Sequence, residues 1–291
     1  MHIAIFLWGF TGLLGKFIQL NEGMLVWYRL LISSVVIAGI LLYRKSFPKL
    51  NLRELMKIGG IGIIVMLHWV TFYGSIKLAS ISVAMVCLSS IALFASIIEP
   101  LVNKTKFDYM EIFFSAVAMI GIYTIYSSDP DASWGIVIGV ISALLSATFS
   151  TLNKTIASKY ESLTISFIEL SSGMIFLTIL FPLYFKIQPT TKFIPDAHDW
   201  MYLFILSVVC TVLTWVLSLQ ALRKVSAYTM GLALNLEPVY GIILAILFAG
   251  EGRFMNKGFI TGTGIILVTV IVHTFYKFYK YRKEENDLRS L

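Results

Sequence analysis

The chain has 291 residues, of which 58% are hydrophobic and 13% are charged, with a formal charge of +7 and a mean hydropathy of +0.83. A soluble domain has about 45–50% apolar and roughly 25% charged residues, so one globular core does not account for this composition. We therefore expect an integral membrane protein, whose excess of basic residues sets its orientation in the bilayer and binds no nucleic acid.

A membrane-spanning helix needs about 20 mostly apolar residues. Ten such runs follow one another along the chain: residues 2–20, 24–43, 56–76, 80–101, 109–127, 134–152, 163–185, 199–220, 227–249 and 258–278. Each run is expected to be an α-helix, because lipid cannot hydrogen-bond to backbone N–H and C=O groups. The first run has no basic segment before it and no small-residue cleavage site, so we interpret it as a retained helix. The sequence predicts an all-α integral membrane protein with ten transmembrane helices.

Lysine and arginine residues are distributed unequally over the connectors. If the N-terminus is cytoplasmic, the inner segments carry Arg44, Lys45, Lys49, Arg53, Lys57, Lys104, Lys106, Lys154, Lys159, Arg223, Lys224, Lys277, Lys280, Arg282, Lys283 and Arg289. The outer segments then carry only Lys77, Lys186, Lys192, Arg253 and Lys257. This asymmetry predicts a multi-pass protein of the inner or plasma membrane with both termini in the cytoplasm, which requires an even number of helices.

Two segments 146 residues apart share residue types at five positions. They are Trp69, Val70, Ile76, Lys77 and Ser80 in one segment and Trp215, Val216, Leu222, Arg223 and Ser226 in the other. Five helices per half place the halves in opposite orientations, as in many secondary transporters with a site near the midplane. The predicted units are residues 1–130, residues 131–280 and a charged cytoplasmic tail, 281–291. The alternative is chance similarity among apolar helices.

A resemblance to a known family is carried by five segments: Leu7–Lys16, Trp27–Arg29, Ser80–Pro100, Leu234–Glu251, and Gly258 with Gly262–Leu267. In these residues the chain resembles the EamA-type members of the drug/metabolite transporter superfamily. The fourth segment is the most specific, with Glu237-Pro238 in mid-helix and Gly250-Glu251 at the helix end. The first half departs from it, with Ser89-Ser90 at the matching place. The resemblance implies ten helices, an inverted repeat and transport of small metabolites.

Ionisable side chains within a span cost about 2.5–3.5 kcal/mol each and usually face a cavity or a partner. Arg29 is a candidate to bind a carboxylate through two parallel hydrogen bonds. Glu237 is a candidate for an ammonium group or a proton, because Pro238 frees carbonyls in the preceding turn. The alternative for Glu237 is a buried acid at a structural kink. Glu169 is a second candidate proton carrier.

Aromatic residues cluster around the same positions. Trp69 and Trp215 occupy matching repeat positions, so we expect them to face each other. An aromatic pocket suits flat or cationic metabolites, whereas the alternative for any one residue is the interfacial aromatic belt. The full candidate set for substrate binding is Trp8, Tyr28, Arg29, His68, Trp69, Tyr73, Glu169, Trp215, Asn235, Glu237 and Tyr240.

The sequence predicts a secondary transporter that moves a small metabolite, such as an amino acid or a related amphipathic compound, by alternating access. By resemblance, the direction is export. Proton coupling is a hypothesis, and we expect no cofactor or metal, because there is no P-loop and no metal-ligand spacing. The alternatives are a non-transporting membrane sensor or partner protein and an intramembrane enzyme, although the scattered His, Asp and Glu residues do not favour an enzyme.

Overall fold

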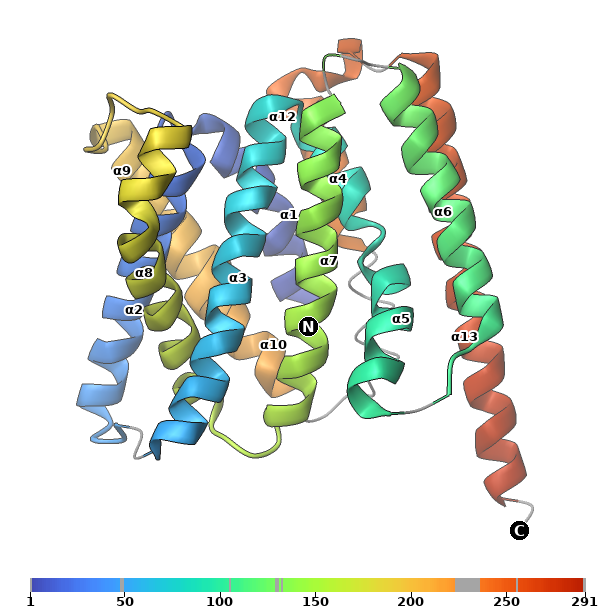
Figure 1. Ribbon diagram of the computed structural model, residues 1–291, viewed down its shortest axis with the longest axis horizontal. Helices are drawn as coiled ribbons and strands as arrows, with labels where there is room; N and C mark the ends of the chain where they lie inside the picture. Colours follow the sequence, from blue (N-terminus) through green and yellow to red (C-terminus); the bar gives the residue numbers. More distant parts are fainter. Residues whose placement is uncertain are drawn as a thin grey trace.

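The computed structural model describes residues 2–47, 50–104, 106–128, 131, 133–222, 236–254 and 256–289. Within these ranges the regular elements are helices, which lie alongside one another in a bundle (Figure 1). The all-α prediction is confirmed for this part of the chain.

Most helices of the described residues lie within the predicted apolar runs or extend them by a few residues. In the first half they are α1 (His2–Phe17), α2 (Glu22–Tyr43), α3 (Leu52–Leu78), α4 (Ile81–Leu88), α5 (Ile91–Asn103) and α6 (Tyr109–Ser128). In the second half they are α7 (Ser133–Ile156), α8 (Ser162–Ile187), α9 (Ala197–Phe204), η1 (Ile205–Leu213), α10 (Thr214–Leu222), α12 (Leu236–Ala249), η2 (Glu251–Phe254) and α13 (Lys257–Arg289).

Seven helices of the described chain are long and apolar enough to cross a bilayer, and the bent pair α4–α5 raises that number to eight. The apolar helices α1 and α12 are shorter, with 16 and 14 residues. At about 1.5 Å per residue neither covers a hydrocarbon core of about 30 Å by itself. The first part of the predicted span 227–249 lies outside the described residues. Ten spans and an inverted repeat therefore stay predictions.

The predicted helix 80–101 is broken, which corrects the expectation of one continuous span. Helices α4 and α5 are bent by 42° relative to each other at Ser89 and Ser90. The two serine hydroxyls donate hydrogen bonds to the carbonyl oxygens of Met85 and Cys87. Such side-chain hydrogen bonds compete with those of the helix backbone, which accounts for a break at this serine pair.

The predicted helix 199–220 is continuous but changes its winding. Its central part, η1, is a π-helix between α9 and α10. Within it the Thr211 hydroxyl donates a hydrogen bond to the Leu206 carbonyl oxygen at 2.7 Å. Widened turns of this kind are rare and often occur at functional sites, because they change which side chains face a neighbouring helix.

Close helix approaches depend on small residues. Helix α3 packs against α7 and α8, and a Cβ added at Gly62 would lie 2.1 Å from the Glu169 carbonyl oxygen of α8. Only glycine fits there. Helices α6 and α13 run side by side at one edge of the bundle (Figure 1), where a Cβ at Gly121 would lie 2.8 Å from the Gly262 carbonyl oxygen.

A buried carboxylate links the two halves. Glu251, in η2, accepts hydrogen bonds from the backbone N–H groups of Ile81 at 2.9 Å and Ser82 at 2.8 Å. These are unpaired donors of the first turn of α4, where the helix dipole also favours a negative charge. The glutamate that follows α12 in the second half therefore caps a helix of the first half.

Candidate functional site

Arg29 of α2 is a buried cation, with only 3% of its surface exposed. Its Nε donates to Thr211 Oγ1 and its Nη1 donates to the Tyr73 hydroxyl, both at 2.8 Å. Its guanidinium carbon lies 3.7 Å from the centroid of the Trp69 ring, in a cation–π contact. Among the described residues, no carboxylate forms an ion pair with Arg29.

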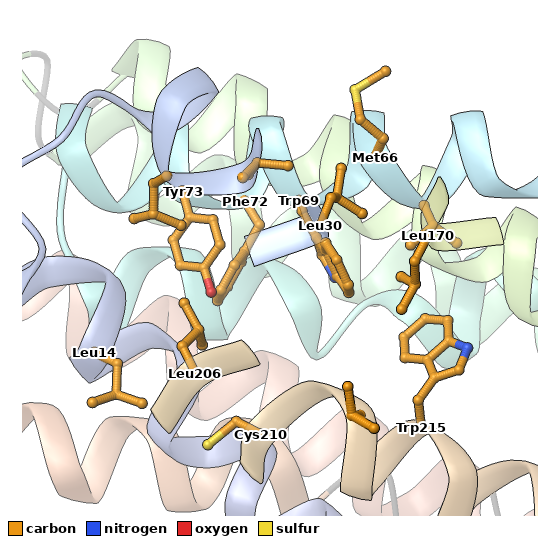
Figure 2. Packing of buried hydrophobic residues seen from close by; sticks show 14 of the residues in the cluster. Leu14, Leu30, Met66, Trp69, Phe72, Tyr73, Leu170, Leu206, Cys210 and Trp215 are labelled. Atoms are coloured by element: carbon orange, nitrogen blue, oxygen red, sulfur yellow. The ribbon is translucent and has the colours of Figure 1, made fainter. Parts of the chain in front are cut away.

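Two elements, α3 and η1, contact this arginine. Trp69 and Tyr73 are four residues apart on α3 and therefore lie on one face of that helix. Figure 2 shows both side chains, with Phe72, projecting from α3 toward the helix that carries Cys210 and Trp215. Helix α1 leaves room for this arrangement at Gly15, where a Cβ would lie 2.1 Å from the Tyr73 ring.

Trp69 and Trp215 face each other, as the repeat spacing predicts. Their ring centroids are 5.7 Å apart with an interplanar angle of 79°, an edge-to-face arrangement. Phe149 of α7 stacks on the other side of Trp215, with centroids 5.8 Å apart. The two halves thus meet through aromatic rings directly beside the Arg29 guanidinium.

Glu169 lies at the far end of this aromatic group and is fully buried. Its Oε2 accepts a hydrogen bond from Trp215 Nε1 at 3.3 Å, and the Asn153 side chain interacts with the same carboxyl. Glu169 Oε1 and Asn153 Oδ1 have no hydrogen-bond partner among the described residues. Two buried acceptors at one place favour a hydrogen-bond donor there, either a proton on the carboxyl or a donor group of a ligand.

His68 supports the aromatic group from the side. Its ring lies 5.4 Å from Phe149, and its Nδ1 forms a hydrogen bond with the backbone carbonyl of Ser142 at 2.9 Å. The Ser142 hydroxyl donates to the His68 carbonyl oxygen at 3.1 Å. These contacts bind α3 to α7, and Phe149 of α7 in turn stacks on Trp215.

Trp8 lies on α1 and Tyr240 lies on the neighbouring helix α12. Trp8 Nε1 donates to Thr214 Oγ1 at 2.8 Å, which joins α1 to α10. Tyr240 packs against Phe6, with centroids 5.4 Å apart, and against the backbone at Gly9. Both residues therefore secure α1 against the second half.

Glu237 is partly buried in the first turn of α12, and its charge interacts with that of Arg29. Pro238 follows it and is buried. The turn before Glu237 lies outside the described residues, as does the candidate Asn235, so the predicted kink is not tested. Of the two candidate carboxylates, Glu237 is the one whose charge interacts with the Arg29 guanidinium.

Tyr28 lies elsewhere, although it precedes Arg29 in the sequence. Its hydroxyl donates to the Phe193 carbonyl oxygen at 3.1 Å and its ring packs on Trp200, in the region that joins α8 to α9. Adjacent helix residues point about 100° apart, so Tyr28 and Arg29 face different neighbours.

In the connector between α8 and α9, a hydrogen bond from Lys192 lowers the pKa of the Asp196 carboxyl below its usual range.

A group of polar contacts surrounds the connector between α1 and α2. Lys77 Nζ donates to the carbonyl oxygen of Leu20, in the connector between α1 and α2. In the same connector, the Gln19 N–H donates to Asp199 Oδ1 at 2.8 Å. Asp199 is fully buried and forms an ion pair with Lys192 at 2.7 Å. The contacts join the connector between α1 and α2 to the C-terminal end of α3 and to the start of α9.

Comparison with known proteins identifies the family. The model of the EamA-like transporter family matches residues 1–127 and 133–275. The chain belongs to the EamA-like transporter family. It is therefore a multi-pass membrane protein of a transporter family, as the sequence motifs indicated.

Individual relatives of this EamA-like protein agree with the assignment. A protein of Archaeoglobus fulgidus described as an uncharacterized transporter is 22% identical over 285 residues, which cover 94% of this chain and 96% of that protein. A solved crystal structure aligns with a TM-score of 0.64 and 14% identity, over 94% of this chain and 95% of that one. At this identity the likeness to the solved structure shows the fold alone.

Sequence reasoning missed several polar residues of this EamA-like site. Thr211 and Thr214 bind Arg29 and Trp8, and Asn153 lies beside Glu169. A threonine or asparagine within an apolar run was the only available signal, and such residues often bond to their own helix. Thr211 also lies in a π-helix, whose altered register has no recognisable hydropathy pattern.

Proposed function

We propose that this protein is a secondary transporter that carries a small amphipathic metabolite with a carboxylate, such as an amino acid, across the cytoplasmic membrane. Transport is by alternating access of two inverted halves, residues 1–130 and 131–280, and it is directed outward. Both termini are cytoplasmic, and the ten predicted helices form the transmembrane part.

One observation carries the substrate class. Arg29 is buried between the halves, and no carboxylate of the described residues forms an ion pair with it. A buried charge is costly without a partner, so a substrate carboxylate that pairs with the guanidinium offsets part of that cost. Hydrogen bonds to charged groups contribute about 1.5–3 kcal/mol, roughly 10–100-fold in affinity.

The neighbouring groups supply the rest of the recognition. Trp69 and Trp215 offer aromatic surface for the apolar part of the metabolite. The carboxyls of Glu169 and Glu237 are available for an ammonium group or a transported proton, and Glu169 has an unpartnered oxygen among the described residues. A zwitterionic compound is complementary to this arrangement of one cation and two carboxyls.

The polar contacts at the N-terminal end of α2 support a gating role. Positive-inside reasoning predicts that this end lies outside the cell, so in this proposal the contacts belong to a closed gate on the outer side. Export then requires separation of Lys77 and Asp199 from the connector between α1 and α2. We infer that this polar cluster is the outer gate.

The test begins with a thermal-shift screen of the purified protein against amino acids and related carboxylates. Compounds that stabilise it are then assayed for saturable flux in proteoliposomes. Arg29→Gln is expected to weaken both responses by roughly 10–100-fold. Arg53→Gln, exposed at the start of α3, is the matched control and should leave both unchanged. The ligand-free stability of each variant is measured in parallel.

The outcomes separate the alternatives. If Arg29→Gln binds and transports as wild type does, the substrate site is not at Arg29. A compound that stabilises the protein without saturable flux indicates a sensor, and a compound that is chemically altered indicates an enzyme.

Proton coupling has its own measurement. An imposed pH gradient should drive accumulation of the substrate in wild-type vesicles, and Glu169→Gln or Glu237→Gln should abolish this drive. If the wild-type flux does not depend on the pH gradient, proton coupling is refuted, whereas the proposal that Arg29 binds the substrate carboxylate is not affected.

A further inference from the structure

A cavity of about 370 Å³ lies on the side of the bundle, separate from Arg29. It is formed by the C-terminal half of α2, the N-terminus of α8, and η1 with α10. Two rows of aliphatic residues line it at a spacing of four, which keeps each row on one helix face. The rows are Val36 and Ile40 on α2, and Val208, Val212 and Val216 on η1 and α10.

The rows end at the same polar edge. Arg44 continues the α2 row by four residues, and Gln220 continues the other row by four. From Val36 to Arg44, helix α2 rises roughly 12 Å at about 1.5 Å per residue. Half of a hydrocarbon core of about 30 Å is about 15 Å. The groove therefore has the depth of one bilayer leaflet.

Two opposite charges stand at the polar edge. Arg44 and Glu161 are both exposed and both line the cavity. Among the described residues neither side chain has a hydrogen-bond or ion-pair partner, and the Glu161 side chain does not cap α8, although Glu161 is the N-cap residue. An apolar groove that ends in an unpaired cation and an unpaired anion is complementary to a zwitterionic amphiphile.

We propose that this groove binds a phospholipid whose headgroup carries both a phosphate and a primary ammonium group. One acyl chain lies between the two aliphatic rows, Arg44 contacts the phosphate, and Glu161 accepts hydrogen bonds from the ammonium group. An anionic headgroup would bring a second negative charge to Glu161, and a quaternary ammonium has no N–H to donate.

A lipid acyl chain matches the aliphatic lining of the groove, and the two opposite charges at its polar edge match a zwitterionic headgroup. The groove shares η1 with the Arg29 site, because Val208 and Val212 line the groove while Thr211 binds Arg29. A lipid in the groove therefore contacts the element that positions the arginine.

The experiment is native mass spectrometry of the detergent-purified protein, titrated with dioleoyl lipids that have phosphoethanolamine, phosphoglycerol or phosphocholine headgroups. The phosphoethanolamine lipid should bind about 10-fold more tightly than the other two. Glu161→Gln should remove its preference over the phosphoglycerol lipid. Arg44→Gln should weaken all three, and Val36→Trp should do the same by filling the groove. Arg53→Gln, exposed outside the groove, should bind as wild type does.

Several results would overturn the proposal. Equal binding of the three lipids by the wild type would show that Arg44 and Glu161 do not distinguish between headgroups. An unchanged headgroup preference in Glu161→Gln would show that the lipid binds elsewhere. Because Glu161 is exposed, this variant should fold even if Val36→Trp does not, so the test does not depend on Val36→Trp. A dimer mass that replaces the lipid adduct would show that a second copy of the chain covers the groove.

Discussion

Replacing Tyr73 with phenylalanine removes a single oxygen at the centre of the candidate site. Tyr73 is fully buried, and its hydroxyl accepts a hydrogen bond of 2.8 Å from Arg29 Nη1. The ring and its packing against Gly15 stay unchanged. The guanidinium loses one of its two hydrogen bonds to described side chains, the other being to Thr211.

The expected loss follows from the charge of the donor. Hydrogen bonds to charged groups contribute about 1.5–3 kcal/mol in water-soluble proteins. Side-chain hydrogen bonds in membrane proteins average only about 0.6 kcal/mol and reach about 1.7, because the unfolded chain in the membrane also finds partners. For a buried charged donor we expect the upper part of that range, so Tyr73→Phe should lower the free energy of unfolding by about 1–2 kcal/mol.

The assay is reversible unfolding in mixed micelles, followed by tryptophan fluorescence. Tyr109→Phe is the control, because Tyr109 is 85% exposed and should change stability by less than about 0.5 kcal/mol. A double-mutant cycle with Arg29→Gln isolates the contact and should give a coupling of at least about 0.5 kcal/mol. Zero coupling, or a Tyr73→Phe variant as stable as wild type, would refute the arrangement of the arginine.

Three further predictions concern packing, capping and pH. Gly62→Ala should destabilise the protein by about 1–3 kcal/mol in the same unfolding assay, because its Cβ would overlap a carbonyl oxygen of α8, whereas Gly60→Ala, with no atom within 4 Å of its Cβ, should be tolerated. Glu251→Gln should lower the unfolding free energy by about 1 kcal/mol, since it removes the charge that caps α4, and a neutral effect would contradict the cap. Burial raises the pKa of Asp108, but hydrogen bonds, first from Lys280 of α13, outweigh it and lower the pKa below its ordinary value. Asp108→Asn should therefore lose stability at neutral pH, and thermal unfolding at decreasing pH should show the difference vanish as wild-type Asp108 becomes protonated, whereas a pH-independent difference would exclude a charge effect.

The sequence predicted the helices of this protein well because the bilayer imposes a simple requirement. Each span needs a long apolar run whose backbone groups are hydrogen-bonded within it, so hydropathy alone located α2, α3 and α6. It failed at local interruptions, such as Ser89 and Ser90 between α4 and α5, because serines are tolerated in helices and only their hydrogen bonds show a break.

The candidate site was predictable to the extent that rare residues marked it. Buried ionisable groups are costly in lipid, which singled out Arg29 and Glu169, and the repeat spacing predicted the contact between Trp69 and Trp215. The partners were not predictable. Lipid-facing and core-facing positions are both apolar in a membrane helix, so hydropathy does not tell which side of a helix meets which neighbour.

By itself the sequence therefore determined that the chain enters the membrane, where most of its helices lie and which charges are worth attention. Only the tertiary structure decided that Arg29 meets Thr211 on a π-helix while its neighbour Tyr28 faces a connector. It also decided that Glu251 caps α4 from 170 positions along the chain. The physical reason is that insertion depends on the summed hydropathy of a segment, whereas a site depends on the direction of single side chains, which the helix register and the neighbouring helices set.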